Sequence, residues 1–209
     1  TSGSYHQEIR ESTVGIWGYG GIGRETARLC KALGLTVHAY ARRGVQPRLN
    51  TYRVAGTGDP DGSLPDRVFT AGQEQEFLAG LDFLVLALPQ TPTSTGIIGE
   101  NELRSMKPSA WLLNPARGPL VQEQALLRAL REGWIAGAAL DTHYHYPMPP
   151  DHPLWNFPNV ILTPHISGSD RGPHYLKRIW EITLRNIQSL ERGEPLWNEL
   201  TPSELNGKS

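Results

Sequence analysis

A glycine-rich turn between an apolar strand and a helix is the feature of this sequence that most limits its fold. Gly18, Gly20 and Gly23 form a G-x-G-x-x-G motif between the apolar run 13–17 and the helical pattern 22–33. The first glycine allows the turn, the second lets a diphosphate approach the backbone, and the third lets helix and strand pack closely. Free N–H groups at the helix start favour an anion. The motif therefore predicts a dinucleotide site, and the alternative is a tight turn that binds no ligand.

Strand and helix patterns alternate along the rest of the chain. We expect strands at 13–17, 35–40, 83–88, 111–113, 135–140 and 160–162, and helices at 22–33, 74–81, 101–106, 121–132 and 173–190. This order predicts an α/β fold with a Rossmann-type doubly wound parallel sheet in three α/β/α layers. Residues 42–69 are rich in Gly, Pro and Arg and predict a long surface loop. We assign 1–12 to a linker or remnant of a preceding segment and 13–169 to the dinucleotide-binding domain.

Charge and cysteine content exclude several classes of partner. Lys and Arg number 20 against 21 Asp and Glu, so the net charge of -1 offers no global basic field for nucleic acid or an anionic membrane. No apolar run approaches the ~20 residues of a transmembrane helix. Cys30 is the single cysteine, which rules out an internal disulfide. A cytoplasmic location is the expectation.

The end of the second strand bears on the choice between NAD and NADP. A carboxylate that binds the adenosine ribose is expected there, but Ala41 stands at that place and is followed by Arg42 and Arg43. The missing carboxylate removes repulsion toward a 2′-phosphate, and two guanidinium groups can pair with it. The sequence favours NADP over NAD; the alternative is that both arginines are solvated loop residues.

Four further motifs follow the glycine turn in a fixed order: LPQTP at 88–92, NPARG at 114–118, AALD at 138–141 and TPHISG at 163–168. Together they resemble the successive signatures of the D-isomer-specific 2-hydroxyacid dehydrogenases over roughly residues 13–197. The resemblance implies an NAD(P)-dependent enzyme that transfers hydride between nicotinamide and a 2-hydroxy or 2-keto acid. The cofactor-binding residues that it implies are Gly18, Gly20, Gly21, Ile22, Gly23, Arg42, Arg43, Leu88, Pro89, Thr91, Pro115, Ala116, Arg117, Asp141, His165 and Gly168.

Two side chains carry the chemistry that the resemblance implies. Arg117 would hold the carboxylate of a small substrate, because its guanidinium fork stays charged near neutral pH. His165 would exchange the proton with the substrate oxygen, because imidazole titrates near working pH. Asp141 resembles the residue that orients the nicotinamide side. The alternatives are a structural ion pair for Arg117, a core histidine for His165 and a loop-capping role for Asp141.

One position departs from the family pattern. Most members have a Glu before a Pro, five residues after the Asp, which stabilises the protonated catalytic histidine; here that residue is Tyr146. A neutral phenol can hold the ring but adds no negative charge. Formate dehydrogenases of the same superfamily carry a neutral Gln and a run similar to Asp151-His152-Pro153. A formate-dehydrogenase-like oxidation, and a non-catalytic nucleotide-binding or interaction protein, therefore stay open as alternatives.

Two features remain: a pair of histidines that could bind a metal, and the substrate-binding domain that the resemblance implies. His143 and His145 are spaced to meet a metal, but the sequence offers no evident third ligand, so we expect no metal site. The family carries a second, substrate-binding domain, and only 17 residues precede Gly18. We expect the helix and tail at 170–209 to complete that missing domain, and the chain alone to bind cofactor with little turnover. The family also implies a homodimer.

Overall fold

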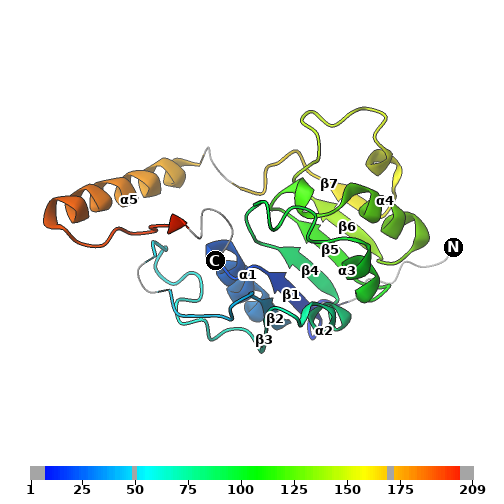
Figure 1. Ribbon diagram of the computed structural model, residues 1–209, viewed down its shortest axis with the longest axis horizontal. Coiled ribbons are helices and arrows are strands. Elements are labelled where there is room, and N and C mark those ends of the chain that lie inside the picture. The colour runs from blue at the N-terminus through cyan, green and yellow to red at the C-terminus, as the bar shows by residue number, and fades with distance from the viewer. Residues whose placement is uncertain (1–7, 49–50, 169–171, 203–209) are drawn as a thin grey trace.

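The computed structural model describes residues 8–48, 51–168 and 172–202. Its centre is a seven-stranded parallel sheet in the order β3-β2-β1-β4-β5-β6-β7, in which the strand order reverses between β1 and β4 (Figure 1). The strands are β1 (Thr13–Trp17), β2 (Thr36–Tyr40), β3 (Arg67–Phe69), β4 (Phe83–Leu86), β5 (Trp111–Asn114), β6 (Gly137–Leu140) and β7 (Val160–Leu162). This is the predicted doubly wound sheet. Ligands bind at such a reversal, beyond the carboxyl ends of the strands.

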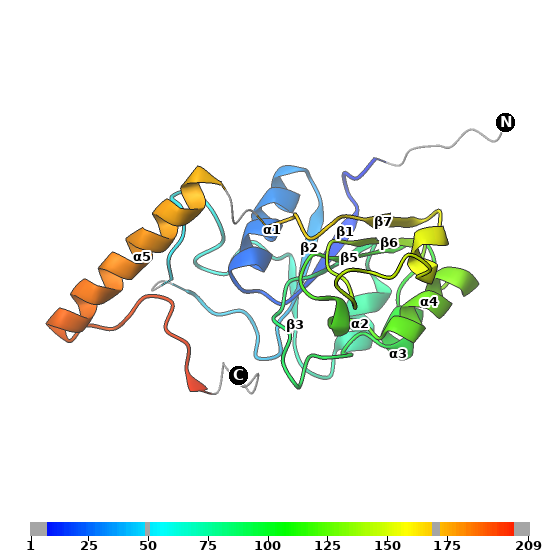
Figure 2. The same ribbon diagram turned by 90° about the horizontal axis from the view of Figure 1, so that it is seen from above.

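Helices flank both faces of the sheet, as predicted. The flanking helices are α1 (Gly21–Ala32), α2 (Glu74–Ala79), α3 (Glu100–Ser105) and α4 (Glu123–Glu132). The chain also forms the short 3₁₀ helices η1 (Gly118–Leu120) and η2 (Pro153–Asn156) and a last helix, α5 (Pro173–Arg192), which lies apart from the sheet. Figure 2 shows α1 on one side of the sheet and α2, α3 and α4 on the other. One apolar cluster, with Val14, Ile16 and Val37, packs beneath α1, and a larger one fills the opposite side.

Close packing explains why β1 contains a glycine. A Cβ on Gly15 would lie 2.2 Å from Cδ1 of Leu81 and 2.8 Å from Cζ of Phe77, both fully buried. Real Cβ atoms do not approach other atoms so closely, because protein interiors are packed at the density of organic crystals. The strand therefore sits directly on the segment around α2, and the carboxyl end of β1 is held at the strand reversal.

The predicted surface loop at 42–69 is partly wrong. Its last three residues form β3, which pairs with β2 through His38↔Arg67 and Tyr40↔Phe69. Three residues are too short for the alternation of apolar and polar side chains to be recognised in the sequence. The loop also contains Asp59, which is only 3% exposed. Part of this loop is therefore packed against the protein, although its polar composition predicts an exposed segment.

The last helix carries an apolar stripe that faces solvent. α5 extends away from the sheet (Figure 1), and its Leu176, Trp180 and Leu184 are each more than half exposed. Among the described residues, it is tied to the loop before β3 by a hydrogen bond of 2.7 Å from Tyr52 Oη to Glu181 Oε2. No helix in the described part of the chain is both long and apolar enough to cross a bilayer.

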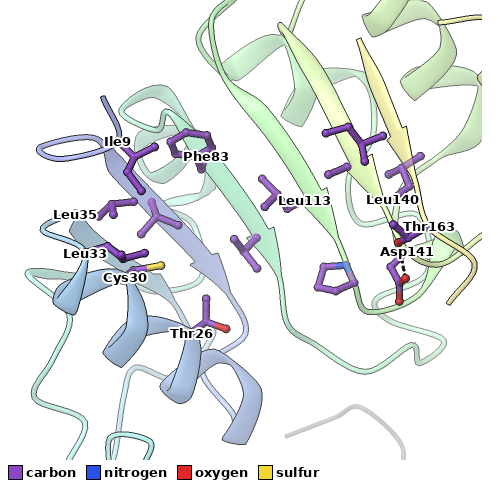
Figure 3. Close-up of a pocket in the computed structure, with 15 residues that line it drawn as sticks. Ile9, Thr26, Cys30, Leu33, Leu35, Phe83, Leu113, Leu140, Asp141 and Thr163 are labelled. Atoms are coloured by element: carbon purple, nitrogen blue, oxygen red, sulfur yellow. Dashed lines mark hydrogen bonds between the residues drawn. The ribbon is translucent and has the colours of Figure 1, made fainter. Parts of the chain in front are cut away.

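An apolar hollow of about 410 Å³ opens on the face of the sheet that carries α1. Figure 3 shows Leu33, which directly follows α1, together with Phe83 of β4 and Leu113 of β5 around it. Beyond α1, this face continues to Ile161 of β7, which is 57% exposed. Neither Arg117 nor His165 lines the hollow, so the residues expected to carry chemistry belong to a different cavity.

Candidate functional site

A crevice of about 750 Å³ lies at the strand reversal, beyond the carboxyl ends of β1, β4 and β5. Its walls contain the glycine turn and both side chains predicted to carry chemistry. The lining residues are Gly20, Gly21, Ile22, Ala87, Leu88, Pro89, Gln90, Pro115, Ala116, Arg117, His165, Ser167 and Gly168. Segments almost 150 residues apart in the sequence thus meet at one edge of the sheet.

The glycine turn fits a diphosphate. Gly18 has φ +99°, and a Cβ on it would lie 2.7 Å from the carbonyl oxygen of Ala87. A Cβ on Gly23 would lie 2.2 Å from the carbonyl oxygen of Gly18, so Gly23 sits beneath the turn and does not line the crevice. Apart from the chain neighbours of Gly21 and the backbone of its own helix, no described atom lies within 4 Å of a Cβ on Gly21, and the first turn of α1 has no acidic residue. The open backbone and the positive helix end are what an anionic cofactor needs.

A second hollow of about 220 Å³ adjoins the crevice on the side of β2. Tyr40, Ala41 and Arg42 line it together with Leu88, Pro89 and Thr91, which the resemblance also assigns to the cofactor. Arg43 lies outside this lining. The hollow contains Ala41 at the place predicted for the ribose-binding carboxylate, so the structure brings Arg42, but not Arg43, to the expected adenosine end.

Arg117 is exposed at the crevice and held there by the side chain of Asn114. Asn114 is 1% exposed. Its Oδ1 accepts hydrogen bonds of 3.2 Å from the backbone N–H groups of Ala116 and Arg117, and its Nδ2 donates one of 2.8 Å to the Arg117 carbonyl. This buried amide fixes the turn after β5, which places Arg117 in the wall of the crevice, where its Nη1 donates to the carbonyl oxygen of Ala116 at 2.6 Å. The sequence motif contained Asn114, but only its tertiary surroundings reveal this role.

His165 contacts the residue that departs from the family pattern. Its Nδ1 lies 3.1 Å from Oη of Tyr146, and the backbone N–H of His143 donates to the same Oη at 3.0 Å. The hydroxyl can donate to a neutral imidazole or accept from a protonated one. Because Nδ1 is engaged, Nε2 is the ring atom available to exchange a proton with a ligand. Tyr146 itself is 60% exposed.

Asp141 holds the segment that carries His165. Its carboxylate is buried and accepts hydrogen bonds from Thr163 Oγ1 (2.5 Å), Ile166 N (2.8 Å), Ser167 N (3.0 Å) and Ser167 Oγ (2.6 Å). Burial alone would raise the pKa of Asp141, but these hydrogen bonds outweigh it and hold the pKa well below its usual value. His165 has φ +58°, a left-handed backbone that is unusual for a residue other than glycine. The contacts of Asp141 are thus those of a loop-capping residue, and Asp141 is not among the residues that line the crevice.

The histidines at 143 and 145 point in different directions. His143 Nε2 lies 2.9 Å from the carbonyl oxygen of Thr163, whereas His145 joins Glu123 and His152 in a group whose ligand atoms lie within 4.8 Å of one another. The sequence did not indicate this group. His152 Nδ1 accepts from Leu154 N, so its Nε2 carries the proton and donates to Glu123 Oε1 at 2.7 Å. Because a metal requires that nitrogen unprotonated, the arrangement favours a hydrogen-bonded pair.

Comparisons with known proteins identify the family of this chain. A sequence model described as "D-isomer specific 2-hydroxyacid dehydrogenase, NAD binding domain" matches residues 2–167. Glyoxylate reductase of Thermofilum pendens is 35% identical over 187 residues, which cover 90% of this chain and 50% of the relative. The chain thus spans about half the length of the curated relatives it matches.

Solved structures agree as well. A D-isomer-specific 2-hydroxyacid dehydrogenase from Xanthobacter autotrophicus Py2, in complex with NADPH and MES, matches with a TM-score of 0.81 at 28% identity, covering 98% of this chain and 59% of that one. The NADPH-dependent glyoxylate/hydroxypyruvate reductase of Sinorhizobium meliloti, in complex with NADP and sulfate, matches with a TM-score of 0.77 at 26% identity, covering 99% and 60%. Because the model of the family's NAD-binding domain matches residues 2–167, more than half of the chain, this chain belongs to the D-isomer-specific 2-hydroxyacid dehydrogenase family.

Proposed function

We propose that this chain is the cofactor-binding part of an NADP(H)-dependent reductase of small 2-keto acids. The observation that carries the proposal is the single crevice lined by the glycine turn, Arg117 and His165. A dinucleotide held at the turn would present its nicotinamide toward the two side chains at the same sheet edge. The names of the relatives, which include glyoxylate reductases and a glyoxylate/hydroxypyruvate reductase, support the substrate class.

The residues of this chain divide the chemistry between them. Arg117 binds the substrate carboxylate through its guanidinium fork and orients the adjacent carbonyl. His165 donates a proton from Nε2 to the carbonyl oxygen, which becomes the hydroxyl of the product. The bound nicotinamide cofactor supplies the hydride. Tyr146 keeps the ring in position through Nδ1 in both of its protonation states.

NADP is the cofactor that we propose over NAD. Ala41 leaves the end of β2 without a carboxylate, and Arg42 lines the hollow beside it. A 2′-phosphate on the adenosine ribose would meet a positive guanidinium there instead of a negative charge. The two solved relatives named above were crystallised with NADPH and with NADP, which supports the same choice.

We also propose that α5 and the tail belong to the part of the protein that binds substrate. The exposed apolar stripe of α5 is available to pack against further protein, and a closed site excludes water from the hydride transfer. Substrate turnover therefore depends on more than the crevice. The homodimer is a proposal from family membership, and sedimentation velocity would test it.

Kinetics on the protein that contains this chain would test the function. NADPH oxidation should depend on glyoxylate or hydroxypyruvate, and His165→Ala should reduce kcat by about 10²- to 10⁴-fold, the usual contribution of a positioned acid-base group. The loss should be larger in kcat than in the affinity for NADPH, measured by fluorescence titration. Formate-dependent reduction of the oxidised cofactor would favour the formate-dehydrogenase-like alternative, which the neutral Tyr146 motivates. Tight cofactor binding with no turnover of any keto acid or formate would favour the non-catalytic one.

A further inference from the structure

The loop between β2 and β3 is anchored to the glycine turn by a buried polar cluster. Tyr19, the residue after Gly18, donates from Oη to Asp59 Oδ2 at 2.7 Å. Arg24 of α1 is 6% exposed and donates to the carbonyl oxygens of Tyr19, Gln46 and Asp59. These contacts join two segments that are 40 residues apart in sequence. The loop therefore has a defined position over the start of α1.

This anchoring brings a further guanidinium to the second glycine of the turn. Arg48 is half-buried, and its backbone N–H donates to the carbonyl oxygen of Pro60 at 2.8 Å. Its Nη1 lies 3.6 Å from the position that a Cβ on Gly20 would occupy, and apart from the residues adjacent to Gly20 no other described atom lies within 4 Å of that position. Gly20 is the place where the motif lets a diphosphate approach the backbone.

The charges around Arg48 leave it available for an anion. Burial lowers the pKa of Arg24, and the positive charge of Arg48 lowers it further, while Asp59 acts in the opposite direction. Asp59 thus compensates the charge of Arg24. Within the described ranges, the Arg48 side chain forms no salt bridge and no hydrogen bond. A half-buried cation that has no partner among the described residues, beside a helix N-terminus, gains a favourable interaction when an anion joins it.

We propose that Arg48 is a ligand of the cofactor diphosphate, with the Tyr19–Asp59–Arg24 cluster holding the loop that presents it. The inference rests on the proposed cofactor binding and extends it to a residue outside all five family motifs. It differs from the proposal for Arg42. A contact with the diphosphate strengthens NADH and NADPH binding equally, whereas a contact with the 2′-phosphate strengthens NADPH binding alone.

The test is the dissociation constant of each nucleotide for wild type, Arg48→Ala, Arg48→Lys and the control Arg53→Ala, measured by isothermal titration calorimetry. Arg53 is an exposed arginine of the same loop, so its loss changes the net charge equally. We expect Arg48→Ala to weaken NADH and NADPH binding about ten- to hundredfold each, the range for a lost charge-assisted hydrogen bond. Arg48→Lys should recover part of the loss, and Arg53→Ala should stay within about twofold of wild type.

Three results would overturn the assignment. If Arg48→Ala binds both nucleotides as tightly as wild type, Arg48 does not contact the cofactor. If the variant binds only NADPH more weakly, Arg48 contacts the 2′-phosphate and not the diphosphate. If Arg53→Ala weakens nucleotide binding as much as Arg48→Ala does, the loss of affinity comes from the change in net charge and not from a contact of Arg48. Wild type that binds neither nucleotide would refute the proposed function itself, and the inference with it. Near-ultraviolet circular dichroism of each variant checks the fold, which should be retained because the Arg48 side chain forms no hydrogen bond with described residues.

Discussion

Asp141→Asn tests whether the buried carboxylate, and not the loop itself, keeps His165 in place. The carboxylate accepts two backbone N–H groups and two hydroxyls from Thr163, Ile166 and Ser167. An amide offers one acceptor oxygen, so its NH₂ group must face a donor that has no other partner. Each charge-assisted hydrogen bond contributes about 1.5–3 kcal/mol. Because hydroxyls can rotate and backbone N–H groups cannot, we expect a net loss of about 2 kcal/mol in the free energy of unfolding.

The pH dependence separates the charge from the shape of the side chain. Hydrogen bonds lower the pKa of Asp141 in the folded protein below its value of about 3.9 in an unfolded chain. A carboxylate whose pKa is lowered by folding stabilises the fold at pH values above its pKa in the unfolded chain. This stabilisation is lost as the pH falls through its pKa in the folded protein. The difference in the free energy of unfolding between wild type and Asp141→Asn should therefore have its full size at neutral pH and become smaller below about pH 4.

Urea unfolding at a series of pH values measures this difference, and amide hydrogen exchange of Ile166 and Ser167 measures the loop directly. Exchange at these two amides should accelerate at least about tenfold in the variant, as a loss of 1.4 kcal/mol or more requires. Asp61→Asn, at an exposed position of another loop, is the matched control. The reasoning fails if Asp141→Asn is as stable as Asp61→Asn at neutral pH, or if its deficit is unchanged at pH 3.

Two further predictions concern the cofactor and the proton. Arg42→Ala combined with Arg43→Ala should weaken NADPH binding at least about tenfold in fluorescence titrations and leave NADH binding nearly unchanged, because only NADPH carries the 2′-phosphate; equal affinities before and after the change would contradict the phosphate contact. Tyr146→Glu should raise the titration midpoint of the His165 ring, followed by NMR, by about 0.5–1 pH unit relative to Tyr146→Phe, because an exposed carboxylate near an imidazolium contributes about 1 kcal/mol. An unchanged or lower midpoint would show that charge at position 146 does not reach the ring.

Much of the scaffold could be predicted because its signals are local. The G-x-G-x-x-G motif, the apolar runs and the helical periodicity lie in short windows, and the structure confirms the parallel sheet, its flanking helices and the turn before α1. The meeting of Arg117 and His165 in one crevice also followed from the sequence, because both come just after predicted parallel strands whose carboxyl ends share one edge.

Contacts between distant segments were decided only by the tertiary structure. Tyr19 is hydrogen-bonded to Asp59, 40 residues away in sequence, and Tyr146 to His165, 19 residues away. The periodicity of the sequence does not predict which polar side chains will form such pairs. Three-residue β3 was missed for a related reason, since its pairing with β2 depends on neighbours rather than on its own pattern. The chain's local patterns determined the elements and the turn, whereas burial determined what its polar groups do. Once Asp141 and Arg24 are removed from water, each must find hydrogen-bond partners, and the nearest ones belong to loops that the fold alone brings within reach.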